Sequence, residues 1–409
     1  MPFSHQNLCR FSSVSLLVSA LVSGSALAIS PASENHQQAV GQPELANAPV
    51  TGIENVHRPR IQLAILLDTS NSMDGLIDQA RNQIWQIVNE FSTARKGGVE
   101  PILEIALFEY GNDGLSINTG YIRKLNGFTR ELDAVSEGLF SLTTNGGSEY
   151  CGYVIKTAIN ELQWSSSDKD VKSIFIAGNE SFAQGPVDYR MVAKLALQKG
   201  ISINTIHAGG WDTGIRDDWE SGALLASGAY MSIDADQKVV HVVAPQDKEI
   251  AELNAQLNST YIPYGNEGAE KVQRQMEQDA QSSKVSSGLL AKRAKSKASS
   301  FYNNAGWDLV DALEEGKIDE AELSKIEDKD LPQTMEGMSD KEKVDYVREK
   351  AKQRKSIKES IAELSQSRQA YVAKVKGEQA VAAPSVGDAL TQAVKKQAEQ
   401  KNFEFEKEK

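Results

Sequence analysis

The feature that most constrains the fold is an apolar run that ends in small polar residues. Residues 61–72 read IQLAILLDTSNS, so the apolar run leads directly into Asp68, Ser70 and Ser72. A continuous apolar run of this length is typical of a strand buried on both faces of a sheet. Residues 74–91 then place apolar side chains at helical spacing. A strand, a polar loop and a helix in this order predict a doubly wound sheet, whose ligands bind beyond the carboxyl ends of the strands.

The polar loop offers one carboxylate and two hydroxyls at alternate positions, from Asp68, Ser70 and Ser72. These hard oxygen ligands suit a divalent cation such as Mg²⁺, which accepts few protein ligands and keeps several waters. A turn that merely caps the following helix would use the same residue types. The loop by itself therefore leaves both a metal site and a structural turn open.

The spacing Asp68-x-Ser70-x-Ser72 after a buried strand resembles the metal-ion-dependent adhesion site of von Willebrand factor type A (VWA) domains. Strand-like and helix-like segments alternate from about residue 60 to residue 257, in an order and size similar to that family. The segments TTNGGSEYCG, FIAGNE and FYNNAGWDLVDAL resemble a group of exported bacterial VWA proteins. The resemblance covers roughly half of the chain. It implies an α/β fold with a doubly wound, mainly parallel, Rossmann-like sheet.

The resemblance also implies ligands on two further loops. In the second loop Ser148 takes the place of the family's usual hydroxyl, with Thr144 and Glu149 as alternatives. The third loop of the family usually offers an Asp, whereas this chain has Gly178 in that place, followed by Asn179 and Glu180. Either Asn179 or Glu180 contacts the ion, directly or through a water, or that side of the metal is open. The predicted metal ligands are Asp68, Ser70, Ser72, Ser148 and Glu180.

Residues 1–28 have the pattern of a secretory signal, with Arg10, an apolar stretch and a small-residue cleavage site at residues 26–28. The apolar stretch is too short and too rich in Ser to be expected to span a bilayer. Residues 29–59 are polar without periodicity and predict a flexible leader. We expect an exported protein, periplasmic or secreted, without a membrane span in the mature chain. Its net charge of −12 argues against a nucleic-acid partner.

Cys151 and His207 carry the enzymatic alternative. The only other cysteine, Cys9, lies in the predicted signal, so Cys151 is expected to be an unpaired thiol. Its predicted place at a helix amino end would lower its pKa, and His207 is predicted at a strand end on the same side. The simpler interpretation is that Cys151 packs as a small apolar residue. We therefore expect no catalytic residues.

Beyond residue 262 the strand signals end and Lys, Glu, Gln and Ala dominate. Helices are predicted at 270–299, 302–313, 320–326, 340–375 and 386–400. The longest predicted helix has apolar residues at alternating spacings of four and three, interrupted by Arg368: these are Ile357, Ile361, Leu364, Tyr371 and Val375. This spacing predicts a short coiled-coil-like seam, which packs either against another copy or within its own domain. A basic cluster is interpreted as a solvated helix face: Lys292, Arg293, Lys295 and Lys297.

The domain organisation predicted from these signals is a VWA domain at residues 60–262, able to fold by itself, and a helical region at 263–409. The expected function is a metal-dependent, adhesion-type protein-binding module of the bacterial cell envelope, whose cation accepts an Asp or Glu side chain of a protein partner. The alternative is a structural scaffold that self-associates through the helical tail and keeps only a vestigial metal loop.

Overall fold

The computed structural model describes residues 58–234, 241–377 and 386–405. The predicted signal peptide and the leader up to residue 57 lie outside these ranges. No helix among the described residues has both the length and the apolar character that a membrane crossing requires.

A six-stranded sheet forms the centre of the α/β part, in the order β4-β3-β1-β5-β6-β7. All neighbouring strands are parallel except β3 and β4, which are antiparallel. The strands are β1 (Arg60–Asp68), β3 (Ile102–Tyr110), β4 (Ile122–Thr129), β5 (Val171–Gly178), β6 (Ser202–Ala208) and β7 (Tyr230–Ile233). The doubly wound, mainly parallel sheet predicted from the sequence is confirmed, although β4 is longer than the short edge strand expected at residues 120–123.

Alternate residues of β1 enter two different hydrophobic cores. Leu63 and Ile65 belong to one core, and Ala64 and Leu66 belong to the other. The reason is the period of two along a strand, which sends successive side chains to opposite faces of the sheet. A strand covered on both faces has no polar side, and this explains its continuous apolar sequence.

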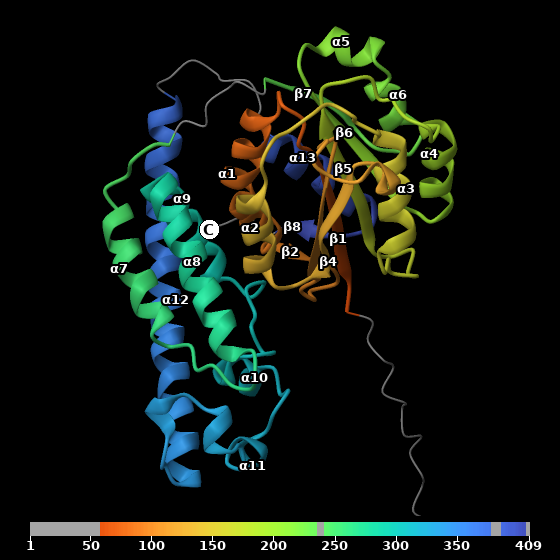
Figure 1. Ribbon diagram of the computed structural model, residues 1–409. Helices are drawn as coiled ribbons and strands as arrows, with labels where there is room; N and C mark the ends of the chain where they lie inside the picture. Colours follow the sequence, from red (N-terminus) through yellow and green to blue (C-terminus); the bar gives the residue numbers. More distant parts are fainter. Residues whose placement is uncertain (1–57, 235–240, 378–385, 406–409) are drawn as a thin grey trace, which may run out of the picture. The chain divides into compact units, whose positions relative to one another are not determined.

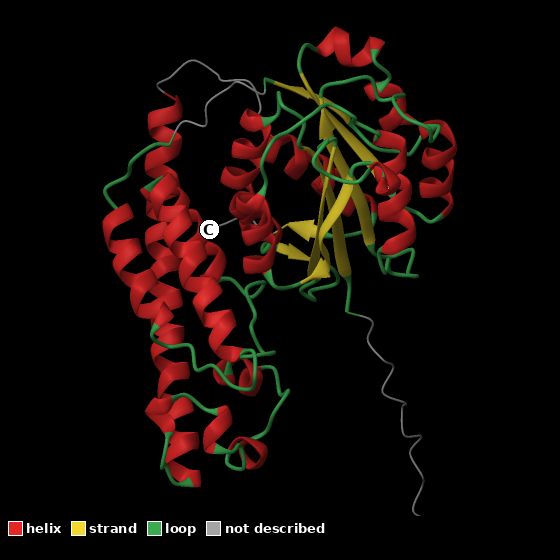
Figure 2. Ribbon diagram, in the orientation of Figure 1, coloured by secondary structure: helices red, strands yellow, loops and turns green. Residues whose placement is uncertain are grey.

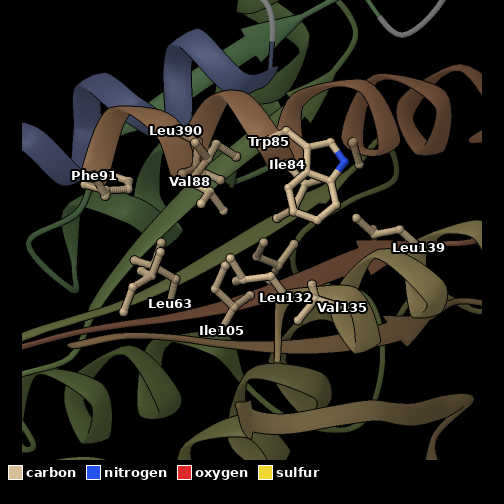
Figure 3. Packing of buried hydrophobic residues seen from close by; sticks show 14 of the residues in the cluster. Leu63, Ile84, Trp85, Val88, Phe91, Ile105, Leu132, Val135, Leu139 and Leu390 are labelled. Atoms are coloured by element: carbon tan, nitrogen blue, oxygen red, sulfur yellow. The ribbon is translucent and has the colours of Figure 1, made fainter. Parts of the chain in front are cut away.

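Helices cover both faces of the sheet (Figure 1). One face packs against α3 (Cys151–Glu161), α4 (Tyr189–Gln198) and α6 (Trp219–Leu224). The other packs against α1 (Asp74–Phe91) and α2 (Leu132–Ser141), and the short helix α5 (Trp211–Arg216) follows β6. Figure 3 shows Ile84, Trp85 and Val88 of α1 above the sheet residues Leu63 and Ile105.

The C-terminal helix α13 (Val386–Gln400) completes the same face as α1. Leu390 and Val394 are buried in one core with Phe175 of β5 and Ile206 of β6, and Figure 3 shows Leu390 beside Val88. The Gln397 side chain donates a hydrogen bond to Asn204 Oδ1 on β6 at 2.9 Å. The sheet core therefore extends beyond residue 262, because a helix from the chain's end supplies part of its cover.

The remaining helices lie beside the α/β part and include the longest of the molecule (Figure 2). They are α7 (Asp247–Asn258), α8 (Gly268–Val285), α9 (Ser287–Ala298), α10 (Leu309–Glu314), α11 (Glu320–Leu323) and α12 (Asp340–Gly377). A two-stranded antiparallel ribbon, β2 (Ala94–Arg95) with β8 (Glu404–Phe405), fixes the end of the chain after α13.

Two predicted tail helices differ from the structure for a local reason. The segment predicted as one helix at 270–299 is two helices, since Ser286 is extended and its hydroxyl accepts from the Leu289 N–H at 3.0 Å as the cap of α9. The helix predicted to begin at residue 302 begins only after Asp308, whose carboxylate accepts from the Asp311 N–H at 2.9 Å. In both cases a capping side chain sets a boundary that apolar spacing does not reveal.

The predicted seam of α12 packs within its own chain. Ile361 is fully buried, and Ile357 and Leu364 pack against the same core. Arg368, which interrupts the seam, forms an ion pair with Asp247 of α7 at 2.5 Å. Packing within its own domain therefore describes the middle of this seam, whereas Tyr371, nearer the end of the helix, is exposed.

The interpretation of residues 292–297 as a solvated basic face is wrong for two of its members. Arg293 and Lys297 are fully buried. Arg293 forms ion pairs with Asp133 and Asp279 at 2.6 Å each, and Lys297 contacts Asp279 at 2.9 Å. Cations are buried only where carboxylates compensate them, and the sequence does not show which distant acids meet them.

Candidate functional site

The site begins at the carboxyl end of β1, the central strand. Asp68 is its last residue and is fully buried. Its Oδ1 accepts a hydrogen bond from the Ser70 N–H at 2.8 Å, while its Oδ2 has no hydrogen-bond partner. The Ser70 hydroxyl is also buried without a partner. Two buried oxygen atoms from the predicted loop thus lack the hydrogen bonds that buried polar atoms normally make.

Backbone hydrogen bonds attach the second loop to the first. The Asn71 N–H donates to the Gly146 carbonyl at 3.1 Å, and the Asn145 N–H donates to the Thr69 carbonyl at 3.0 Å. Gly146 has a φ of +81°, and a Cβ there would collide with the side chain of Asp113, so this turn requires glycine. The two loops predicted to bind the same cation are therefore neighbours.

The second loop places its three candidate ligands differently. Ser148 is half-buried and forms a β-bridge with Gly111 at the end of β3. The Thr144 hydroxyl donates to Asp74 at 2.8 Å and so links the second loop to the start of α1. Glu149 is buried, and a Cβ on Gly111 would lie 2.6 Å from Asp68 Oδ1 and 2.9 Å from Glu149 Cγ. Of the three, the Glu149 side chain lies beside Asp68.

Arg81 of α1 binds the C-terminal end of α2, where the second loop begins. Its Nε donates to the Leu139 carbonyl and its Nη2 to the Leu142 carbonyl, both at 2.9 Å. These carbonyls belong to the C-terminal end of α2, where the second loop begins. The last carbonyl groups of a helix have no hydrogen-bond partner within the helix. A guanidinium can bond to several of them, because it carries several N–H donors in a fixed geometry.

The third loop contributes Asn179 to the site. Its Nδ2 donates to Ser72 Oγ at 3.0 Å, and its Oδ1 is buried without a hydrogen-bond partner. The Glu180 side chain is exposed, and its backbone N–H donates to Glu149 Oε2 at 3.3 Å. Asn179 therefore connects the first and third loops, while the predicted ligand Glu180 lies at the solvent edge.

The two buried carboxyl groups influence each other's protonation. Burial raises the pKa of Asp68 above its usual range. Burial also raises the pKa of Glu149, and the negative charge of Asp68 raises it further. The charge of Glu180 acts in the same direction on both groups. Two charged carboxylates are therefore unfavourable here unless a cation compensates them.

The donor set fits a small divalent cation. Three buried oxygen atoms without partners come from different positions of the site: Asp68 Oδ2, Ser70 Oγ and Asn179 Oδ1. In the part of the chain that the structure describes, no group of three or more His, Cys, Asp or Glu side chains could hold a metal ion. A cation here would accordingly rely on hydroxyl, amide and water oxygens in addition to carboxylate, which is the chemistry of Mg²⁺ rather than of a thiolate or imidazole metal.

Gly178 and Tyr110 close the buried side of the site. The Tyr110 hydroxyl donates to the Ala177 carbonyl at 3.0 Å. A Cβ on Gly178 would lie 2.5 Å from that hydroxyl and 3.1 Å from Asp68 Oδ2. Glycine at the place where VWA domains usually have Asp thus leaves room for Tyr110. Neither the sequence spacing nor the apolar pattern indicates this contact.

The structure does not join Cys151 and His207. The buried Cys151 thiol lies 3.7 Å from the Tyr110 hydroxyl, and its burial raises its pKa. His207 Nε2 lies 3.3 Å from the Asn179 carbonyl, with the imidazole beside Trp219 and its pKa lowered by burial. Among the interactions of the described residues, none connects this thiol to this imidazole. Cys151 begins α3, but burial outweighs the effect of the helix terminus.

No family model matches the sequence, and no curated protein matches it. Among solved structures, the protein BatB from Bacteroides thetaiotaomicron has a TM-score of 0.33 and 14% identity, covering 42% of this chain and 90% of that one. The SpRpn10 VWA domain has a TM-score of 0.31 and 16% identity, with 44% and 100% covered. A mussel byssus protein, proximal thread matrix protein 1 with a zinc-occupied MIDAS (metal-ion-dependent adhesion site) motif, has a TM-score of 0.33 and 14% identity, with 44% and 43% covered.

The arrangement of the strands is what identifies the fold. The sheet order, the single antiparallel edge strand and the meeting of the three predicted loops at the carboxyl end of β1 are all present in this chain. The fold expected from the sequence is therefore confirmed: an α/β part with a doubly wound, mainly parallel sheet, accompanied by a helical region.

Proposed function

We propose that this protein is a metal-dependent protein-binding module of the cell envelope. The observation that carries the proposal is the set of unpaired, buried oxygen atoms, Asp68 Oδ2 and Ser70 Oγ, at the carboxyl edge of the sheet. Buried polar atoms without partners are costly, by about 1–3 kcal/mol each, unless something else binds them. A divalent cation would satisfy both atoms.

Each loop has a distinct role in this proposal. Asp68 supplies the negative charge, and Ser70 and Ser72 supply neutral hydroxyl oxygens. Ser148 and Glu180, the ligands expected from the second and third loops, would act directly or through waters, and Asn179 fixes the orientation of Ser72 through its hydrogen bond. Such a site supplies a positive centre with exchangeable positions, and an Asp or Glu side chain of a partner protein is the group that would fill one.

The proposed location is the periplasm or the exterior of a bacterial cell. It rests on the signal-like pattern of residues 1–28. Self-association through the tail remains the alternative. It has less support, because Ile357, Ile361 and Leu364 of the α12 seam pack within the same chain, where α12 contacts α7 and α9.

Calorimetric titration of the full chain with MgCl₂ tests the proposal. Asp68→Asn keeps the shape of the side chain but removes its charge, and it is expected to abolish Mg²⁺ binding without loss of the far-ultraviolet circular dichroism signal. Asp113→Asn is the matched control, since this exposed carboxylate lies near Gly146 but is not a proposed ligand. Equal Mg²⁺ affinity in wild type and Asp68→Asn would refute the metal site.

A further inference from the structure

The loops at the carboxyl edge of the sheet are strongly acidic. We consider five described segments at this edge: the connections 69–73, 111–121, 142–150 and 179–188, and residues 209–218, which contain α5. Their acidic residues are Asp113, Glu149, Glu180, Asp188, Asp212, Asp217 and Asp218, and the only basic residue in these segments is Arg216. Asp68 and Asp74 lie immediately beside the first loop. A single divalent cation would leave this face negative.

Some of these acids are compensated by a neighbouring helix. Arg190 of α4 lies 3.7 Å from Asp188 and 3.5 Å from Asp218. By contrast, the side chains of Asp113 and Asp212 are exposed, and no ion pair of the described residues includes either of them. The negative charges of Asp113 and Asp212 therefore remain without an ion-pair partner within the described ranges. Asp113 follows β3 and Asp212 follows β6, and these strands lie on opposite sides of β1 in the sheet.

An exposed aromatic side chain lies next to one of these acids. Trp211, at the start of α5, is 53% exposed and packs against Tyr230 with ring centroids 4.5 Å apart. The Tyr230 hydroxyl donates to the Trp211 carbonyl at 2.7 Å and holds it in place. An exposed indole suits a Lys or Arg side chain, and Asp212, the next residue of α5, offers an exposed carboxylate to another.

The third loop connects α5 to the metal site. His207 contacts the Asn179 carbonyl, and a Cβ on Gly214 of α5 would lie 2.9 Å from His207 Cβ. Asn179 in turn contacts Ser72. Because β1, β5 and β6 are parallel and α5 follows the carboxyl end of β6, Trp211 and Asp212 lie at the same edge of the sheet as the proposed cation.

We infer that the partner presents its metal-binding carboxylate among Lys or Arg side chains, so that the partner's surface is basic around a single Asp or Glu. An acidic surface would be repelled by Asp113, Asp212 and Glu180 even where its carboxylate reached the cation. A basic surface is attracted to the whole face, and its cationic side chains pair with the free acids and Trp211. This inference rests on the proposed function and specifies its partner.

Three fluorescent ten-residue peptides test the inference on the full chain, by anisotropy at low ionic strength. The first has one Asp between Lys residues, the second has the same Asp between Ser residues, and the third has the Lys residues but Asn in place of Asp. Each is titrated in MgCl₂ and in EDTA. The double variant Asp113→Asn/Asp212→Asn probes the face, and Glu359→Gln/Glu363→Gln is the charge-matched control, because these exposed acids lie on α12.

The Lys–Asp peptide is expected to bind in MgCl₂ and to lose its binding in EDTA. The Ser–Asp and Lys–Asn peptides are expected to bind the wild type at least about tenfold more weakly than the Lys–Asp peptide. The Asp113→Asn/Asp212→Asn variant is expected to bind the Lys–Asp peptide about fivefold more weakly than the wild type does, which is the effect of losing two exposed ion pairs. The control variant is expected to change little, and raising the salt concentration to weaken binding.

Failure of the inference and failure of the proposed function give different results. Equal binding of the Ser–Asp and Lys–Asp peptides, or an unchanged affinity in the Asp113→Asn/Asp212→Asn variant, would overturn the basic partner and leave the metal-dependent function standing. If the Lys–Asp and Lys–Asn peptides bind with equal affinity, and EDTA changes neither affinity, the proposed metal-dependent function is overturned while a basic partner is supported. Binding of none of the three would overturn the inference, and the calorimetric Mg²⁺ titration then decides the metal site independently.

Discussion

Asn179 Nδ2 donates a hydrogen bond to Ser72 Oγ at 3.0 Å and joins the third loop of the site to the first. The amide oxygen of the same side chain is buried and has no partner. Asn179 thus orients the proposed ligand Ser72, and its own Oδ1 is available to the same candidate metal site. By contrast, the neighbouring Glu180 carboxylate is exposed and acts on the site through its charge.

The first prediction compares these two residues. Asn179→Ala is expected to weaken Mg²⁺ binding by about 10–100-fold, the usual effect of removing a side chain that orients a ligand. Asn179→Asp is expected to strengthen it, because a carboxylate adds charge where an amide oxygen lies. Glu180→Gln is expected to change it less than Asn179→Ala. Calorimetric titration measures the Mg²⁺ affinity of all three variants. A larger loss of affinity in Glu180→Gln than in Asn179→Ala would indicate that Glu180 is the principal ligand of the third loop.

The second prediction concerns the Cys151 thiol. Its burial raises its pKa, so the reactive thiolate is scarce at neutral pH. In a Cys9→Ser chain, where Cys151 is the only cysteine, a thiol reagent is expected to react at least about tenfold more slowly with the native protein than with the protein in denaturant. Modification at equal rates in the two states would instead favour an accessible, enzyme-like thiol.

The third prediction concerns the buried ionic cluster around Asp279. Burial alone would raise the pKa of Asp279, but Lys297 and Arg293 outweigh that effect and hold it well below its usual range. A carboxylate with a lowered native pKa stabilises the fold above its unfolded pKa, and this contribution is lost as the pH falls through the acid range below about pH 4. Asp279→Asn is expected to cost about 3–5 kcal/mol at neutral pH, because it leaves two buried cations undercompensated.

Chemical denaturation of the wild type and Asp279→Asn at pH 7 and at about pH 2 measures this effect, because the contribution of Asp279 is lost only below its unfolded pKa of about 4. The free energies of unfolding of the two proteins are expected to converge as the pH falls. An exposed acid of the same helix, Glu277→Gln, is the control and is expected to behave like the wild type. A difference that stays constant with pH would show that the Asp279 carboxylate does not titrate as described.

The fourth prediction concerns the cover that α13 gives to the sheet. Leu390 is 2% exposed and packs in the core with β5 and β6. Leu390→Ala is expected to lower the free energy of unfolding by about 2–5 kcal/mol, as for other buried Leu→Ala changes. Gln392→Ala, on the exposed side of the same helix, is the matched control. A loss of less than about 1 kcal/mol in Leu390→Ala would mean that the sheet domain is stable without α13.

The sequence predicted the sheet, and the position of the first loop at its carboxyl edge, because both depend on short-range patterns. Residues 63–67 are apolar without interruption since both faces of β1 are covered, and Asp68 and Ser70 follow at the end where such strands bind ligands. Asn179 was only one of two options for the third loop. The choice between Asn179 and Glu180 depends on which side chain turns toward Ser72, and spacing alone does not determine that direction.

The tail was harder to predict because its polar residues act over long distances. Arg293 and Lys297 have the composition of a solvated face, yet Asp133 and Asp279 make them core residues. Asp133 lies 160 positions from Arg293 along the chain. No local pattern links two such residues, whereas the periodicity of an apolar stripe is visible within a few turns of helix.

The position of α13 also has a consequence for the time course of folding. β1 pairs with β3 and β5, but the face over β5 and β6 is covered by α13, whose Gln397 lies 193 positions from its partner Asn204 on β6. Contacts between such distant segments slow folding, because a long loop must close before they form. Until α13 docks, Phe175 and Ile206 lack their final partners. The docking of α13 therefore sets the moment at which the sheet beneath the metal loops becomes rigid.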